Sequence, residues 1–203
     1  MSQDAEYFLS LQTETGWGRL LAQFRDWIDP QPDWLALDVG CGPGLMPALL
    51  DQRDCRSFGI DINYQMFLPS PLHPQVVTAD VLQLPFPDLV FDLITASNLL
   101  FLLPDPQAAL HAMRGKLRPG GQIAVLNPSE HLTVTNALKL IEARNLSGLA
   151  RETLLNWAAR AEAHFHWTEA ESFELFAAVE LEWVDTHIIM GPVFARLVRG
   201  ERV

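Results

Sequence analysis

One stretch near the amino terminus constrains the fold more than any other: residues 35–44 read Leu-Ala-Leu-Asp-Val-Gly-Cys-Gly-Pro-Gly. Its apolar run is typical of a buried parallel strand, in which both faces are covered. Gly40, Gly42 and Gly44 follow at alternate positions, and glycine lets the backbone turn tightly and approach a ligand closely. The residues after the loop contain few helix breakers. The stretch therefore predicts a strand, a loop and a helix, with a ligand at the start of the helix.

The identity of that ligand is left open by the loop alone, as is the plainer interpretation of an ordinary strand-to-helix turn. A dinucleotide-binding loop has the spacing G-x-G-x-x-G, but Leu45 occupies the place of its third glycine. Asp38, just before the loop, would repel the phosphates of a dinucleotide. The same carboxylate suits a ligand that carries positive charge.

Composition narrows the class of protein. The chain has 203 residues, which fits one domain with a good core. With 49% hydrophobic and 19% charged residues, it should be globular. The net charge of −11 would repel a polyanion, so we expect no general nucleic-acid binding.

The cellular compartment of the chain can also be predicted. It contains no apolar run of the roughly eighteen residues that a membrane span needs, and its start lacks the order of a signal peptide. Cys41 and Cys55 do not make a disulfide framework or a zinc site. We therefore expect a cytoplasmic protein without a membrane span.

Two further aspartates stand where predicted strands end. Residues 57–62 predict a second strand with Asp61 near its end, and residues 75–78 predict a third, followed by Asp80. Since parallel strands end on one edge, Asp38 should share a rim with both. Asp61 stands where a carboxylate would hold two ribose hydroxyls. Asp80 fits a turn aspartate as well as a partner for an exocyclic amino group.

The rest of the chain continues the alternation of strands and helices. Residues 91–96 and 122–127 predict a fourth and a fifth strand. Asp105-Pro106 predicts the cap and first turn of the helix between them, and glycines 120–121 predict its end. The expected fold class is therefore α/β, with a doubly wound sheet.

Five segments in order resemble the class I S-adenosylmethionine-dependent methyltransferases, of the small-molecule kind grouped with ubiquinone and menaquinone biosynthesis enzymes. They are Leu-Asp-Val-Gly-Cys-Gly-Pro-Gly (37–44), Gly-Ile-Asp (59–61), Ala-Asp-Val-Leu-Gln-Leu-Pro-Phe (79–86), Phe-Asp-Leu-Ile (91–94) and Leu-Arg-Pro-Gly-Gly (117–121). Together they cover about residues 34–127 in the family's order and spacing. The final third of the chain agrees more loosely.

The resemblance implies S-adenosylmethionine as cofactor and S-adenosylhomocysteine as product. It assigns to the cofactor Asp38, Gly40, Cys41, Gly42, Gly44, Asp61, Ile62, Asp80, Val81 and Ser97. In the family's pattern the glycines pass the methionine part, Asp61 holds the ribose hydroxyls, and Asp80 with Val81 contacts adenine. Ser97 would lie beside the methionine part, below the methyl group. This cofactor is a sulfonium with an α-ammonium group and no phosphate, which explains the carboxylates at the rim.

The resemblance also completes the expected architecture: a Rossmann-like sheet of seven strands whose last strand is antiparallel, with a helical insertion after the fifth strand. We expect one methyltransferase domain over residues 1–203. Its parts are an amino-terminal arm and helix (1–33), a cofactor-binding core (34–128), a helical insertion (129–166), and a helix with the last two strands (167–203). In the family such an insertion covers the pocket and shapes the acceptor site; a helical extension of the core is the alternative.

Methyl transfer chiefly needs alignment, with the acceptor atom about 3–3.5 Å from the activated methyl group. A general base is needed only where the acceptor must lose a proton, and His131 beside Glu130 is the best placed candidate. His164 and His166 have metal-like spacing but lack a further ligand nearby, so we expect no metal.

Two acceptor classes do not fit. The chain lacks the Asn- or Asp-Pro-Pro-aromatic motif that enzymes methylating base amines carry after the fourth strand. Neither cysteine is placed to attack a pyrimidine. The function predicted is methyl transfer to an oxygen, nitrogen or carbon atom of a small organic acceptor. The alternatives are a non-catalytic protein that binds S-adenosylmethionine or S-adenosylhomocysteine, and a nicotinamide-dependent oxidoreductase.

Overall fold

The computed structural model describes residues 3–67, 72, 75–164, 167–189 and 194–203. The described strands form one seven-stranded sheet in the order β3-β2-β1-β4-β5-β7-β6. The strands are β1 (Leu35–Val39), β2 (Arg56–Asp61), β3 (Val76–Thr78), β4 (Phe91–Ser97), β5 (Leu117–Pro128), β6 (Leu181–Ile189) and β7 (Ala195–Arg202). Strands β1 to β5 are parallel, and β7 lies antiparallel between β5 and β6. The predicted doubly wound sheet with an antiparallel last strand is thus confirmed.

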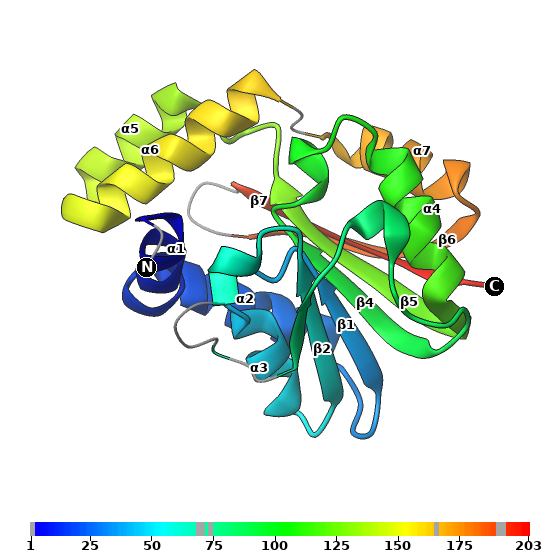
Figure 1. Ribbon diagram of the computed structural model, residues 1–203. Coiled ribbons are helices and arrows are strands. Elements are labelled where there is room, and N and C mark those ends of the chain that lie inside the picture. The colour runs from blue at the N-terminus through cyan, green and yellow to red at the C-terminus, as the bar shows by residue number, and fades with distance from the viewer. Residues whose placement is uncertain (1–2, 68–71, 73–74, 165–166, 190–193) are drawn as a thin grey trace.

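Helices cover both faces of the sheet, as Figure 1 shows. The helices are α1 (Gln3–Glu14), α2 (Gly16–Ile28), α3 (Leu45–Asp51), α4 (Pro106–Lys116), α5 (Val134–Arg144), α6 (Gly148–Ala163) and α7 (Glu169–Ala178). Short 3-10 turns add η1 (Tyr64–Phe67), η2 (Val81–Gln83) and η3 (Leu100–Leu102). Helices α2 and α3 lie on one face, and α4 and α7 lie on the other. The predicted insertion forms the pair α5 and α6, which sits beside α1.

Alternate side chains of each central strand enter two separate cores, as the pleat of a strand requires. On β1, Ala36 packs with α2 and α3, while Leu37 packs with α4 on the opposite face. On β5, Leu126 joins the first core and Val125 the second. This two-sided burial explains why these strands read as continuous apolar runs in the sequence.

Capping side chains define several helix ends in the way the sequence predicts. Asp105 accepts from the Ala108 N–H at 2.9 Å and so begins α4, with proline as its first residue. Thr168 and Glu171 form a capping box at the start of α7. Asn145 ends α5 in the left-handed conformation, and α6 begins three residues later at Gly148.

The amino-terminal segment differs from the predicted arm and single helix over residues 1–33. The structure has two helices there, and Thr15 separates them by donating to Leu11 O and accepting from Trp17 N. A Cβ at Gly18 would lie only 2.5 Å from Gln12 O, so the glycine is what allows α1 to lie so close to α2. This packing places α1 over the carboxyl edge of the sheet.

The glycines at 120–121 also differ from prediction, because they lie inside β5 and not at a helix end. A Cβ at Gly121 would lie 2.8 Å from Phe91 O, so the missing side chain lets β5 approach β4 where their register shifts. The predicted link between the last two strands, Gly191-Pro192, lies outside the described residues. No helix in the described part of the chain is long and apolar enough to span a bilayer.

Candidate functional site

The strand order reverses between β1 and β4, which opens a crevice at the carboxyl ends of these two neighbouring strands. The glycine loop that follows β1 borders this crevice. Gly40, Gly42 and Gly44 have φ of 74°, 53° and 96°, a region that side chains disfavour. A Cβ at Gly40 would also lie 3.2 Å from the side chain of Leu99. The backbone shape of this loop therefore requires the glycines that the sequence shows.

Asp61 lies at the end of β2 and is tied to the glycine loop. Its Oδ2 accepts from the Gly42 N–H at 3.0 Å, and its Oδ1 accepts from the Asn63 N–H at 2.9 Å. Burial raises the pKa of this carboxyl, although the backbone N–H groups of Asn63, Gly42 and Ile62 lower it in part. Each oxygen keeps a lone pair for a further donor. Asp61 can therefore accept from two ligand hydroxyls while it holds the loop.

Asp38 is on the predicted edge but lies beneath the loop, with 1% of its surface exposed. Its Oδ1 accepts from Thr95 Oγ1 at 2.7 Å. Burial raises the pKa of Asp38 to about 7, and the charge of Asp61 adds to this while the bond from Thr95 opposes it. Cys41 is buried nearby, and a Cβ at Gly59 would lie 2.7 Å from its Sγ. Asp38 and Cys41 thus support the loop from behind.

Asp80 follows the strand next to Asp61, as the sequence predicts, because β2 and β3 pair in parallel with Asp61 opposite Thr78. Its carboxylate accepts from the Leu82 N–H at 2.9 Å and so begins the turn η2. Val81 is 8% exposed and Ile62 is 71% exposed. Asp61 and Asp80 thus follow neighbouring strands on one edge of the sheet, but Asp38 is buried below that edge. The adenine role of Asp80 and Val81 stays a prediction.

A cavity of about 750 Å³ opens in front of this rim. Four of the predicted residues line it, and we call them the glycine rim: Gly40, Gly42, Asp61 and Ser97. The opposite side is lined by helices α1 and α6 and is called the helical wall. Its residues are Tyr7, Phe8, Leu11, Gln12, Glu152, Thr153, Asn156, Trp157, Ala159, Arg160 and Ala163. A volume of this size is in the range of sites for cofactor-sized ligands.

The helical wall is held to the sheet at one point that sequence reasoning missed. Trp157 of α6 donates its indole N–H to Asn98 Oδ1 at 2.6 Å. Its ring also meets Trp17 of α2 edge to face, with centroids 5.3 Å apart. Asn98 follows β4 directly and has a positive φ of 54°. Its position directly after Ser97 could have indicated Asn98 as a site residue. Its pairing with Trp157 is a tertiary contact, which the sequence does not show.

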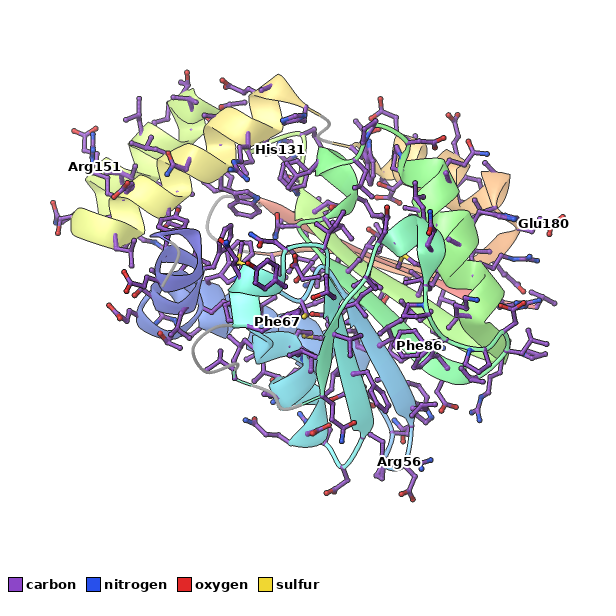
Figure 2. The ribbon with its side chains drawn as sticks, viewed as in Figure 1. Arg56, Phe67, Phe86, His131, Arg151 and Glu180 are labelled. Atoms are coloured by element: carbon purple, nitrogen blue, oxygen red, sulfur yellow. The ribbon has the colours of Figure 1, made fainter. Side chains whose placement is uncertain are left out.

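His131 lies away from the described cavity wall. Its side chain is 49% exposed, and its Nε2 is 3.7 Å from Glu130 Oε1. Figure 2 shows His131 above the strands, in the upper part of that view. Glu130 itself forms a bidentate pair with Arg196 at 2.8 and 2.9 Å. The structure therefore does not bring the predicted general base to the cavity.

Metal ligands do not gather in the described part of the chain: no group of three or more His, Cys, Asp or Glu side chains could hold an ion there. His164 is described as the residue that ends α6, while His166 lies outside the described residues. The metal-like spacing of these two histidines is therefore left without structural support.

Part of the chain matches a known protein family and several curated relatives. Residues 37–125 match the family described as "Methyltransferase domain". A ubiquinone biosynthesis O-methyltransferase of Pseudomonas fluorescens (strain SBW25) is 30% identical over 110 residues, which is 48% of this chain and 47% of the relative. The corresponding enzyme of Idiomarina loihiensis is 27% identical over 169 residues, 78% of this chain and 64% of that one. The chain spans about half the length of most of the curated relatives it matches.

Solved structures share the fold. A putative methyltransferase in complex with the Haloferax volcanii Trm112 methyltransferase activator has a TM-score of 0.70 at 17% identity, covering 98% of this chain and 96% of that one. The magnesium protoporphyrin IX methyltransferase of Synechocystis PCC 6803, crystallised with SAH, has a TM-score of 0.63 at 16% identity, covering 91% and 81%. The [4+2]-cyclase SpnF has a TM-score of 0.66 at 16% identity, covering 91% and 80%. Because a cyclase shares this fold, an activity must be argued from the site.

Proposed function

We propose that the chain, as a class I S-adenosylmethionine-dependent methyltransferase, transfers a methyl group from S-adenosylmethionine to a small organic acceptor. One observation carries the proposal. The glycine rim, with the Asp61 carboxylate, opens directly into a cavity that the helical wall closes from the other side. Such a cavity has one side for a nucleoside cofactor and another for an acceptor.

The residues of the glycine rim fit this cofactor. Gly40 and Gly42 present bare backbone in conformations that a side chain would strain, so a ligand can lie against them. Asp61 offers carboxylate lone pairs to the ribose hydroxyls. No phosphate has to be accommodated, which agrees with a rim whose charged side chain is acidic.

Gln12 of α1, at the edge of the helical wall, reaches the glycine loop and adds a polar group that the sequence did not single out. Its Oε1 is buried and has no hydrogen-bond partner among the described residues. Its Nε2 lies 3.6 Å from where a Cβ of Gly42 would stand, so the amide lies beside the glycine loop. A free carbonyl oxygen at this place suits the α-ammonium group of the cofactor.

When bound, S-adenosylmethionine supplies a sulfonium methyl group, which an acceptor lone pair takes while the S–C electron pair stays on sulfur as neutral S-adenosylhomocysteine. The chain's own contribution is binding and alignment. Asp61 and the glycines orient the nucleoside side. Trp157 is buried and donates a hydrogen bond to Asn98, so it holds α6 across the cavity from the glycine rim. The acceptor is thereby kept on the side opposite the cofactor. Nothing in this account requires His131.

Calorimetry with S-adenosylhomocysteine tests the cofactor part of the proposal. We expect one binding site per chain, and absence of binding at about 1 mM would contradict the proposal, since cofactor-sized sites reach micromolar affinity with few favourable contacts. Transfer of labelled methyl from S-adenosylmethionine to a panel of phenols, amines and carbon acids tests the reaction. Binding without transfer to any acceptor class would instead indicate a non-catalytic binding protein.

The setting that we propose is the cytoplasm. Cys41 and Cys55 are both buried free thiols, which a reducing compartment preserves. The proposed partner is the small-molecule acceptor alone, because a net charge of −11 opposes nucleic acid.

A further inference from the structure

Besides Gln12 Oε1, two polar atoms of the helical wall and the end of β4 have no partner in the part of the chain that the structure describes. Within the described chain, neither Asn98 Nδ2 nor Thr153 Oγ1 has a hydrogen-bond partner, although both atoms are buried. Both residues line the cavity. Burying an unpaired polar atom costs folding free energy, so such atoms are rare unless something else supplies their partner. Two such atoms in the lining of one cavity indicate a ligand that supplies the missing hydrogen-bond partners.

The orientation of the Asn98 amide is determined by its neighbours. An indole N–H can only donate, so the 2.6 Å contact from Trp157 identifies the Asn98 oxygen as the acceptor there. The amide nitrogen is then the free group, and it can only donate. The backbone of Asn98 is held too, because its N–H donates to Leu126 O at 2.7 Å and its φ is 54°. A left-handed residue held on both sides is the kind of local strain that collects at ligand sites.

Thr153 extends this patch along α6. It lies four residues before Trp157, which puts both side chains on the same face of the helix. Thr153 is 9% exposed and Trp157 is 7% exposed, so the patch is screened from bulk water. A hydroxyl can donate or accept, so it can pair with the same ligand oxygen or with a neighbouring substituent. We call Asn98 and Thr153 the polar patch.

Aromatic rings line the same cavity as the polar patch. Trp157 and Trp17 meet edge to face at 88°, and Tyr7 and Phe8 of α1 also line the cavity. Rings of this kind favour a flat aromatic ligand, which they contact by their faces and edges. The cation Arg160 and the anion Glu152 stand two helical turns apart on α6, so neither sign of charge dominates this side.

We infer that the polar patch is the acceptor subsite, and that the acceptor is a small aromatic molecule whose ring carries an oxygen-containing substituent, which receives a hydrogen bond from Asn98. This inference rests on the proposed function, because it places the acceptor opposite the glycine rim. It gives the acceptor class that the cofactor residues leave open. It also gives Asn98 the role of an acceptor-binding residue that Trp157 positions.

A matched pair of probes tests the inference by binding alone. Acetophenone and α-methylstyrene have the same shape, but only acetophenone carries an oxygen. Both are titrated by ligand-observed NMR into the protein saturated with S-adenosylhomocysteine. We expect acetophenone to bind about tenfold more tightly, as one buried hydrogen bond allows. Equal affinities for the two probes would overturn the inference.

Variants show whether the polar patch causes the preference. Asn98→Asp keeps an oxygen for Trp157 but replaces the donor by a carboxylate, so the tenfold preference for acetophenone should fall to about one. Asn145→Asp is the matched control, since Asn145 is also left-handed but is exposed at the end of α5. The control should keep the preference. If Asn98→Asp keeps it, or Asn145→Asp loses it, the assignment of Asn98 is wrong.

Thr153 provides a second pair should Asn98→Asp fail to fold. Thr153→Val removes the hydroxyl with little change of shape and should lower the preference about threefold, whereas Thr153→Ser should keep it. Equal preferences in these two variants would contradict the inference. Its failure is distinct from failure of the proposed function, because the latter would already appear as absent binding of S-adenosylhomocysteine to the unchanged protein.

Discussion

The two sides of the cavity are built by different means. The glycine rim is made chiefly by the backbone: Gly40 and Cys41 donate to Ile60 O at 2.8 and 2.9 Å, and Gly42 donates to Asp61. The helical wall is made by side chains, above all Trp157, which joins α6, the end of β4 and α2. A backbone-built rim admits few sequence changes, while a side-chain wall can change residue by residue without altering the sheet.

This difference assigns separate tasks to the two sides. Under the proposed function, the glycine rim suits the nucleoside cofactor, which is the same for every acceptor. The helical wall then suits the acceptor, which differs from one enzyme to another. It also follows that a change in the rim should mainly weaken cofactor binding, whereas loss of Trp157, which joins the wall to the sheet, should mainly weaken folding. Variants of each side can test this division.

Trp157→Ala should have the largest effect, and it should be on stability. Trp157 is 7% exposed and belongs to the core that joins α6 to the sheet. Replacing a buried tryptophan by alanine costs about 3–5 kcal/mol of unfolding free energy through lost contacts and the cavity left behind. Urea denaturation followed by circular dichroism measures this loss. A loss below about 1 kcal/mol would show that the helical wall is not packed as described.

Asp61→Ala should act on cofactor binding, unlike Trp157→Ala, which acts on stability. Losing a carboxylate that accepts from the ribose should weaken binding of S-adenosylhomocysteine by roughly 1–3 kcal/mol. Calorimetry gives the dissociation constant directly. Asp185→Ala is the control, because Asp185 is an exposed aspartate of β6 at the other edge of the sheet. The control variant should bind S-adenosylhomocysteine with the same affinity as the unchanged protein. An unaltered affinity in Asp61→Ala would remove the ribose assignment.

Much of the glycine rim could be predicted from sequence, because its parts are local. A strand, three glycines and an aspartate at the next strand's end have fixed places along the chain, and parallel strands bring those ends together. The burial of Asp38 could not be predicted, since the sequence shows that it ends a strand and not that Thr95 of β4 covers it.

The helical wall was less predictable for the same physical reason. Trp157 lies in the segment predicted as a helical insertion, but its contact to Asn98 spans 59 positions in the sequence. Helix α1 was predicted only as an arm, because its place over the site depends on the close approach at Gly18. Tertiary contacts of this kind leave no periodic signal.

Asp38→Asn should change how stability depends on pH. Since the pKa of Asp38 is raised from 3.8 to about 7, the folded chain holds a proton that the unfolded chain releases within this window. The unfolding free energy should therefore decline as pH rises from about 4 to 7, and the neutral asparagine should abolish that share of the decline. We expect the variant to gain at least about 1.4 kcal/mol over the unchanged protein across the window. Denaturation at several pH values measures this difference. A difference that stays constant would contradict the raised pKa.

His131→Gln should have the smallest effect. A general base contributes roughly 10²- to 10⁴-fold to a rate, but His131 is half exposed and lies off the cavity wall. With an acceptor found in the labelled-methyl panel, kcat should change by less than about twofold. A loss of about a hundredfold or more would restore the original prediction that this histidine takes the acceptor's proton.

A crystal structure with S-adenosylhomocysteine bound would decide whether the cavity is divided in this way. We expect the ribose hydroxyls on the Asp61 carboxylate, the methionine part along Gly40 and Gly42, and the sulfur facing the space beside Asn98 and Trp157. S-adenosylhomocysteine bound elsewhere, or bound with Asp61 turned away from the ribose, would contradict the division of the cavity into a glycine rim and a helical wall.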